Sequence, residues 1–130
     1  MNVLLVEDHA ATRDEMNALI GGQPDLLVSQ AGSAEEAIAI AKQAEFDVVV
    51  MDIALPGMNG VEATRRILSD HPNTKVLALS NFSGAALVQA VLAAGGRGYV
   101  HKNRAFEELI PAIRAVVAGN RYLGTDADQH

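Results

Sequence analysis

Five short apolar runs alternate with segments of helical periodicity along the chain, and this alternation constrains the fold more than any other feature of the sequence. The runs are rich in β-branched residues and cover residues 3–6, 26–29, 47–51, 75–79 and 98–100. The first, third and fourth are almost continuously apolar, which is typical of strands buried on both faces of a parallel sheet. Strand–helix repetition with right-handed crossovers predicts an α/β fold with three layers.

Caps and stops delimit the helical segments. Ser33 and Glu36 stand at capping-box spacing before the second segment, and Asn59 and Glu62 repeat a similar spacing before the third. Glycine pairs at 21–22 and 95–96 end the first and fourth segments. The sequence therefore predicts five helices that connect five strands.

The composition is that of one compact domain. The chain has 130 residues, a formal charge of −6 and no cysteine, so disulfides and thiolate chemistry are excluded. An acidic domain of this size is a poor candidate for gripping nucleic-acid phosphates, and neither a signal peptide nor a membrane span is expected. We predict a domain over 1–119 and a polar tail, or the start of a linker, over 120–130, where the periodicity disappears.

Charged and hydroxyl side chains follow the predicted strands at the point where each strand ends. In open parallel sheets, ligands bind at the carboxyl ends of the strands, so these side chains are expected to meet at one edge. The candidates are three carboxylates, one hydroxyl and one ammonium group: Glu7, Asp8, Asp52, Ser80 and Lys102.

Asp52 is the strongest of these candidates. The others have ordinary explanations when each is taken alone, such as a helix cap or a solvated turn. Asp52 follows a buried apolar strand, where an unpaired charge is costly. Clustered carboxylates repel one another and suit a hard cation such as Mg²⁺, and a carboxylate beside such an ion can act as a nucleophile toward a phosphoryl group. Acyl-phosphate formation accounts for every charged group at this edge.

Five segments resemble the signature of response-regulator receiver domains in both order and spacing, and the ending of the chain is most similar to the NarL/FixJ class. The segments are VLLVED at 3–8, DVVVMD at 47–52, LPGMNG at 55–60, LALS at 77–80 and GYVHK at 98–102. The resemblance extends to about residue 119. It implies a flavodoxin-like (βα)5 sandwich with a five-stranded sheet of order 2-1-3-4-5.

The resemblance also implies a role for each matched site residue. It implies that Asp52 accepts the phosphoryl group, that Lys102 binds that group, and that Ser80 and Tyr99 form the coupled switch. The Mg²⁺ ligands that it implies are Glu7, Asp8, Asp52 and the backbone carbonyl of Ala54.

The resemblance further implies the setting in which the domain works. It implies a cytoplasmic two-component or phosphorelay protein, phosphorylated by a sensor histidine kinase or phosphotransfer protein, that can form a homodimer on phosphorylation. Such a domain catalyses only its own phosphorylation and dephosphorylation. Members of the class usually continue into a helix-turn-helix output domain that regulates transcription, so this domain itself is not expected to bind DNA.

Three positions depart from the usual pattern, and two alternatives remain open. Asn103 stands where many relatives have proline after the lysine, and Ala54 and Asn81 flank the path of the hydrolytic water in relatives. A Mg²⁺-dependent phosphohydrolase of the haloacid-dehalogenase type needs an acid two residues after its nucleophile, and Ala54 occupies that position. The second alternative is a receiver-like interaction module that is never phosphorylated.

Overall fold

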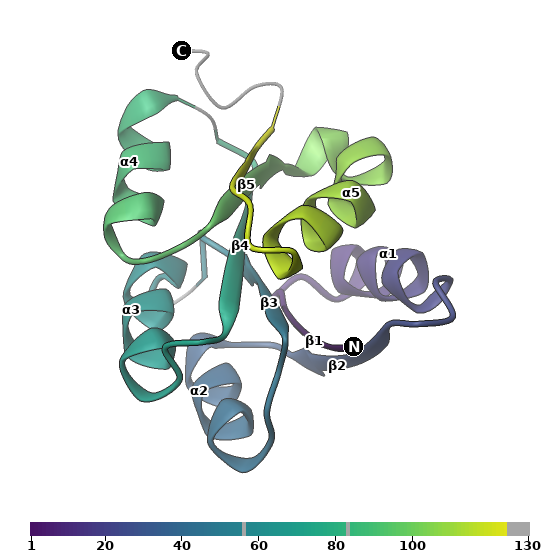
Figure 1. Ribbon diagram of the computed structural model, residues 1–130, viewed down its shortest axis with the longest axis horizontal. Helices are drawn as coiled ribbons and strands as arrows, with labels where there is room; N and C mark the ends of the chain where they lie inside the picture. Colours follow the sequence, from purple (N-terminus) through teal and green to yellow (C-terminus); the bar gives the residue numbers. More distant parts are fainter. Residues whose placement is uncertain (56, 83, 125–130) are drawn as a thin grey trace.

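The structure, a computed structural model, describes residues 1–55, 57–82 and 84–124. Strands and helices alternate along the chain as the sequence predicts (Figure 1). The elements are β1 Asn2–Val6, α1 Ala10–Gly21, β2 Leu27–Ala31, α2 Ala34–Gln43, β3 Val48–Asp52, α3 Gly60–Asp70, β4 Lys75–Ser80, α4 Ala85–Ala93, β5 Gly98–His101, the 3-10 helix η1 Lys102–Arg104, α5 Ala105–Val117 and β6 Tyr122–Leu123.

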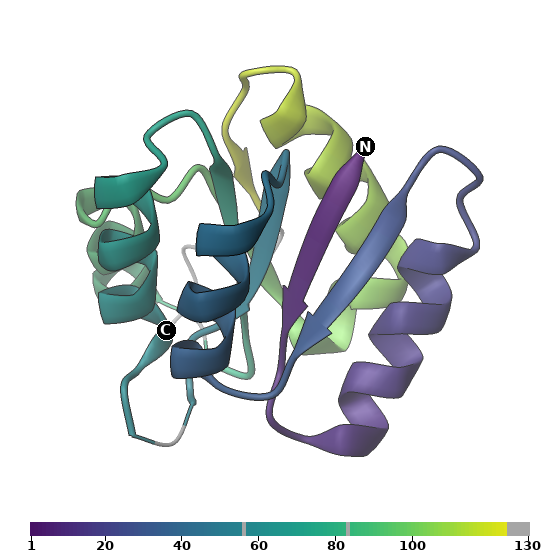
Figure 2. The ribbon, with the colours of Figure 1, turned by 90° about the horizontal axis from the view of Figure 1, so that it is seen from below.

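The strands form one parallel sheet of order β2-β1-β3-β4-β5-β6. This confirms the α/β class and the predicted order 2-1-3-4-5. Helices α1 and α5 cover one face, and α2, α3 and α4 cover the other, so the strands lie between two helical layers (Figures 1 and 2). The fold is therefore the predicted three-layer sandwich with one additional edge strand.

The core follows from the apolar character of the central strands. All five residues of β3 are buried, as are the last four of β1. Because successive side chains of a strand point to opposite faces, Leu5 and Val50 pack with α1 and α5, whereas Leu4 and Met51 pack with α2 and α3. The sheet is thus buried on both sides, and polar side chains can converge only at its ends.

The predicted helix caps are present. Ser33 Oγ accepts a hydrogen bond from the Glu36 amide at 3.1 Å, and Asn59 Oδ1 accepts one from the Glu62 amide at 2.9 Å. Such side-chain acceptors satisfy amides that have no partner inside the helix. Among the described residues, no helix is long and apolar enough to cross a membrane.

The five-strand prediction needs one correction, since Tyr122–Leu123 forms a sixth strand beside β5. The Tyr122 amide donates to the Arg97 carbonyl at 3.1 Å, and the Gly124 amide donates to the Tyr99 carbonyl at 2.8 Å. A two-residue strand has no room for an alternating pattern, so the sequence carries no periodic signal for it. The rest of the predicted tail, residues 125–130, lies outside the described residues.

Candidate functional site

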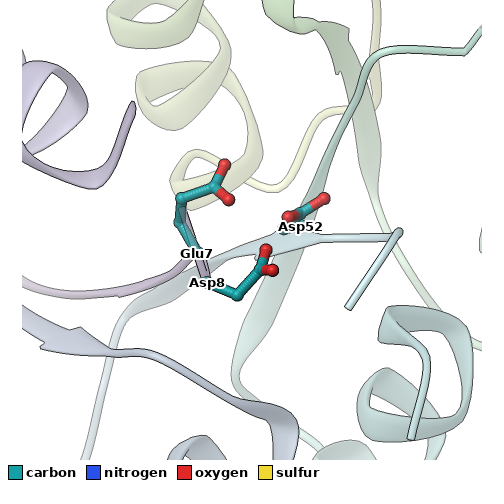
Figure 3. Close-up of side chains that lie close together, drawn as sticks. All are labelled: Glu7, Asp8 and Asp52. Atoms are coloured by element: carbon teal, nitrogen blue, oxygen red, sulfur yellow. The ribbon is translucent and has the colours of Figure 1, made fainter. Parts of the chain in front are cut away.

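The predicted site residues meet at the carboxyl edge of the sheet because the strands are parallel and in register. Val6 pairs with Met51, so the residues that follow them, Glu7 and Asp52, lie side by side. Glu7, Asp8 and Asp52 each offer a carboxylate oxygen, and these three oxygens lie within 4.8 Å of one another (Figure 3). The structure therefore brings together the three carboxylates that the sequence predicts.

Lys102 completes this group from the end of β5. Its Nζ atom lies 2.7 Å from Glu7 Oε1 and 3.3 Å from Asp52 Oδ2, so one ammonium group pairs with both carboxylates. The side chain of Glu7 is 0% exposed, that of Asp52 is 2% exposed and that of Lys102 is 13% exposed. Asp8 is exposed. Among these four residues, three carboxylates face one ammonium group, which leaves an excess of negative charge.

Burial and crowding shift the protonation of this group. Burial raises the pKa of Asp52 to about 6, and the neighbouring Glu7 carboxylate adds to the shift, although Lys102 and the Ala54 amide oppose it. Burial lowers the pKa of Lys102, but its bonds to Glu7 and the charge of Asp52 outweigh this effect and raise the pKa above its usual value. Lys102 therefore stays charged at neutral pH, and Asp52 is predominantly ionised there.

Backbone amides bind the two buried carboxylates, and a guanidinium group binds the backbone carbonyl of Glu7. The His9 amide donates to Glu7 Oε2 at 3.1 Å, and Arg13 Nη1 donates to the Glu7 carbonyl at 2.9 Å. The Ala54 amide donates to Asp52 Oδ1 at 3.1 Å. Arg13 carries no sequence signal for this role, because an arginine on the first turn of a helix has no motif of its own.

Gly60, the first residue of α3, allows the helix to begin directly behind Asp52. Its amide donates to the Ile53 carbonyl at 3.0 Å. A Cβ atom at this position would collide with the Asp52 carbonyl oxygen and would lie 2.8 Å from the Ile53 Cα atom. The glycine therefore holds the turn after Asp52 against the helix and restricts the backbone of the candidate phosphoryl acceptor.

Ser80 and Tyr99 lie on neighbouring strands, offset by two residues in register. Ser80 is buried and pairs in register with His101, two residues after Tyr99. The Ser80 Oγ atom accepts a hydrogen bond from the Phe82 amide at 2.9 Å. The Tyr99 side chain is fully buried in a small apolar cluster with Ala78, Val88 and Val91, beneath α4. The two predicted switch residues are thus on paired strands but not opposite each other, and Tyr99 is not part of the carboxylate cluster.

The three unusual positions differ in their surroundings. The described residues contain no cis peptide bond, so the bond between Lys102 and Asn103 is trans. The Asn103 amide donates to His101 Nδ1 at 3.1 Å. Ala54 and Asn81 are exposed at the rim of the site. The structure places the Ala54 backbone beside Asp52, and the role of its carbonyl as a metal ligand stays a prediction.

The donor set suits a hard divalent cation. Three carboxylates within a few ångströms, with one ammonium group to balance them, repel one another unless a cation lies among them. Carboxylate and backbone oxygens are the ligands that Mg²⁺ prefers, and Mg²⁺ usually takes only one or two carboxylates and keeps several waters. The exposed position of Asp8 leaves the solvent side open for such waters and for a phosphoryl group.

Two pockets lie away from the carboxylates themselves. The larger, about 550 Å³, is at the opposite edge of the sheet and is lined in part by Asp47, His71 and Lys75. The smaller, about 350 Å³, lies beside Arg13 and Gly32. None of the predicted site residues lines either of these two pockets.

Comparisons with known proteins agree with this geometry. The profile of the response regulator receiver domain matches residues 3–114. The chain is 37% identical over 130 residues to the response regulator GacA of Pseudomonas viridiflava, covering 99% of this chain and 61% of the relative. It is 35% identical over 130 residues to the response regulator UvrY of Escherichia coli K12, covering 99% of this chain and 60% of the relative. The chain therefore spans about three fifths of the length of these relatives.

Solved structures show the same arrangement. A two-component response regulator of the LuxR family from Aurantimonas sp. SI85-9A1 superposes with a TM-score of 0.93 at 35% identity, covering 97% of this chain and 91% of that chain. The response regulator domain of Thermotoga maritima CheB superposes with a TM-score of 0.83 at 29% identity, covering 91% of this chain and 96% of that chain.

Proposed function

Because this chain belongs to the response regulator receiver domain family, we propose that it is a phosphorylation switch of a two-component system whose phosphoryl acceptor is Asp52. The observation that supports this proposal is the cluster of Glu7, Asp8, Asp52 and Lys102 at one edge of the sheet. A purely structural cluster would not need two buried carboxylates to share one lysine, since burying such charges costs stability.

Asp52 has the properties of a nucleophile for phosphoryl transfer. Its pKa of about 6 leaves the carboxylate predominantly ionised at neutral pH, and the Ala54 amide fixes the position of Oδ1. In the proposed reaction, a carboxylate oxygen of Asp52 forms a bond to the phosphorus of a phosphohistidine. The bond between phosphorus and the imidazole nitrogen breaks, and its electron pair stays on the imidazole. The departing nitrogen takes up a proton from solvent, so the products are an aspartyl phosphate and a neutral histidine.

Glu7, Asp8, Asp52 and the Ala54 carbonyl would hold Mg²⁺. When bound, this ion supplies positive charge that draws the carboxylates together and stabilises the charge on the phosphoryl oxygens. Glu7 is held for this purpose by the His9 amide and, through its own carbonyl, by Arg13. The Lys102 ammonium group lies 3.3 Å from Asp52 Oδ2 and can bind a second phosphoryl oxygen.

In this proposal Ser80 responds to the phosphoryl group. The hydrogen bond from the Phe82 amide uses a lone pair of Ser80 Oγ and leaves its hydroxyl hydrogen for a phosphoryl oxygen. Movement of Ser80 would change the packing beside Tyr99, which is buried against α4. Such a rearrangement is a population change between two packed states and requires no refolding.

The partners follow from the family. The donor would be a sensor histidine kinase or a phosphotransfer protein, and the phosphorylated protein would form a homodimer. Similar proteins of known structure include a LuxR-family response regulator, so the output we propose is transcriptional, through a DNA-binding region separate from this domain. The formal charge of −6 agrees with a receiver that does not bind DNA itself. We place the protein in the cytoplasm, where such kinases present their phosphohistidine.

Intact-mass spectrometry tests the proposal. The purified protein is incubated with acetyl phosphate, with and without Mg²⁺, and Asp52→Asn is treated in parallel. We expect one acid-labile phosphoryl group that requires Mg²⁺ and is absent from the variant. A folded protein that binds Mg²⁺ but gains no phosphoryl group would instead support the phosphorylation-independent interaction module. The phosphohydrolase alternative has no support at position 54, where Ala54 offers no acid.

A further inference from the structure

The last strand of the sheet is bonded to the segment that carries Tyr99. We call residues 122–124 the C-terminal latch. Within it, the Tyr122 amide donates to the Arg97 carbonyl at 3.1 Å, and the Gly124 amide donates to the Tyr99 carbonyl at 2.8 Å. The latch therefore covers the outer edge of β5, whose other edge is paired with β4 and Ser80.

A buried carboxylate adds a side-chain attachment. Glu108, on α5, is 5% exposed, and its Oε1 atom accepts a hydrogen bond from the Tyr122 hydroxyl at 3.3 Å. Its Oε2 atom lies 3.2 Å from Nε of Arg104. Arg104 ends the η1 turn that begins with Lys102. One carboxylate thus joins the latch to the turn that presents the phosphoryl-site lysine.

The latch packs closely against Tyr99 of β5 and Glu108 of α5. Gly124 is buried, and a Cβ atom there would lie 2.7 Å from Glu108 Oε1 and 3.0 Å from the Tyr99 carbonyl oxygen. A side chain at this position would force the latch away from β5. The docked state therefore depends on the present placement of Tyr99 and Glu108.

Two connections consequently run from the candidate phosphorylation site to the latch. The first is the backbone of β5, from Lys102 through Tyr99 to the Gly124 amide. The second passes through side chains, from the η1 turn through Arg104 and Glu108 to Tyr122. A displacement of Lys102 or Tyr99 would change the geometry of both connections. Of the two strands that pair with β5, β6 is the shorter, with two residues.

We propose that the latch is docked when Asp52 is unphosphorylated and is weakened when Asp52 is phosphorylated, so that the switch controls the attachment of residues 122–124 to β5. This inference rests on the proposed function. The direction follows from the bonds that are already made: the amides of Tyr122 and Gly124 and the Tyr122 hydroxyl each have an acceptor. A shift of β5 can lengthen these bonds, whereas none of these three donors has a bond left to gain. A short strand at the edge of a sheet has low local stability, so a small change in free energy is enough to weaken its pairing.

Amide hydrogen exchange measured by NMR tests the proposal on the full chain. Exchange at Tyr122 and Gly124 is compared with and without acetyl phosphate and Mg²⁺, while intact mass records the phosphorylated fraction. We expect exchange at both amides to become faster by about tenfold, within the usual range of coupling between sites. Unchanged or slower exchange in a fully phosphorylated sample would overturn the latch proposal alone. Failure to form any adduct would overturn the proposed function and the latch proposal together.

Two variants separate coupling from general loosening. Glu108→Gln removes the charge that binds Arg104, and Glu107→Gln is its matched control, because Glu107 also pairs with Arg104 at 3.4 Å but its side chain is exposed. We expect Glu108→Gln to show fast latch exchange before phosphorylation and little further change after it, with Glu107→Gln behaving as the wild type. Equal behaviour of the two variants would contradict the side-chain connection.

Gly124→Ala provides an independent test, since it acts by steric displacement outside the helical core. Coupling between two sites is reciprocal, so undocking the latch must favour the phosphorylated state. The affinity for beryllofluoride, a stable mimic of the phosphoryl group, reports this equilibrium. We expect it to rise roughly fivefold or more in Gly124→Ala. An unchanged affinity, in a variant whose circular dichroism matches the wild type, would overturn the coupling.

Discussion

Replacing Asp52 by asparagine is expected to stabilise the protein in the absence of Mg²⁺. The pKa of Asp52 is raised from 3.8 to about 6, mainly by burial and then by the Glu7 carboxylate. A folded-state pKa above the unfolded value means that ionisation of Asp52 opposes folding. Asparagine keeps an oxygen that can accept from the Ala54 amide, and it carries no charge. The variant therefore removes a repulsion that the proposed metal would otherwise relieve.

The size and the pH dependence of this stabilisation follow from the raised pKa of Asp52. A difference of about two pKa units corresponds to at most about 3 kcal/mol of unfolding free energy at neutral pH, and we expect roughly 1–3 kcal/mol. The stability that the protonated Asp52 carboxyl group gives the folded wild type is fully present below the unfolded pKa of 3.8. It is lost as the pH rises through the folded pKa of about 6. The advantage of Asp52→Asn should therefore be largest above pH 7 and should shrink toward pH 5.

Urea unfolding at several pH values measures this advantage, with Asp14→Asn as a control at an exposed position. Adding Mg²⁺ should stabilise the wild type, by about 2.7 kcal/mol at a hundredfold excess over Kd, and should stabilise the variant much less. The reasoning is refuted if Asp52→Asn is no more stable than the wild type at pH 8 without Mg²⁺. It is also refuted if the advantage does not decrease on acidification.

Three further substitutions test the geometry of the site. Lys102→Gln leaves the carboxylates of Glu7 and Asp52 without their ammonium partner, and we expect a loss of about 3 kcal/mol in urea unfolding at pH 7.5 together with loss of phosphorylation in the intact-mass assay. Gly60→Ala places a methyl group against the Asp52 carbonyl and should cost about 1–3 kcal/mol in unfolding free energy and slow phosphorylation by acetyl phosphate. Arg13→Gln removes the guanidinium that holds the Glu7 carbonyl, and calorimetric titration should show Mg²⁺ affinity lowered on the order of tenfold, with little loss of stability.

The sheet and its carboxyl edge could be predicted from the sequence because their signals are local. Continuous apolar runs identified β1, β3 and β4, and the residues that follow buried strands of a parallel sheet must meet at one edge. This relation predicts that Glu7 and Asp52 meet at that edge. The helix caps at Ser33 and Asn59 were likewise predicted from spacing alone.

Features that depend on tertiary contacts could not be predicted in this way. β6 is two residues long and is held by carbonyl groups of β5, a relation that no periodicity encodes. Arg13 acts on the Glu7 carbonyl from the next helix, and Glu108 is buried and contacts Tyr122 and Arg104, which belong to separate elements of the sequence pattern. The peptide after Lys102 is trans in the structure, whereas the sequence left its isomer open.

The central claim is that Asp52 itself receives the phosphoryl group. Borohydride reduction converts an aspartyl phosphate to homoserine, so treatment after incubation with acetyl phosphate and Mg²⁺, followed by peptide sequencing in the mass spectrometer, identifies the modified residue. The account predicts homoserine at position 52, dependent on Mg²⁺, with none at Asp8 or Asp47. A phosphoryl group trapped at another residue, or no homoserine in a folded protein, would contradict it.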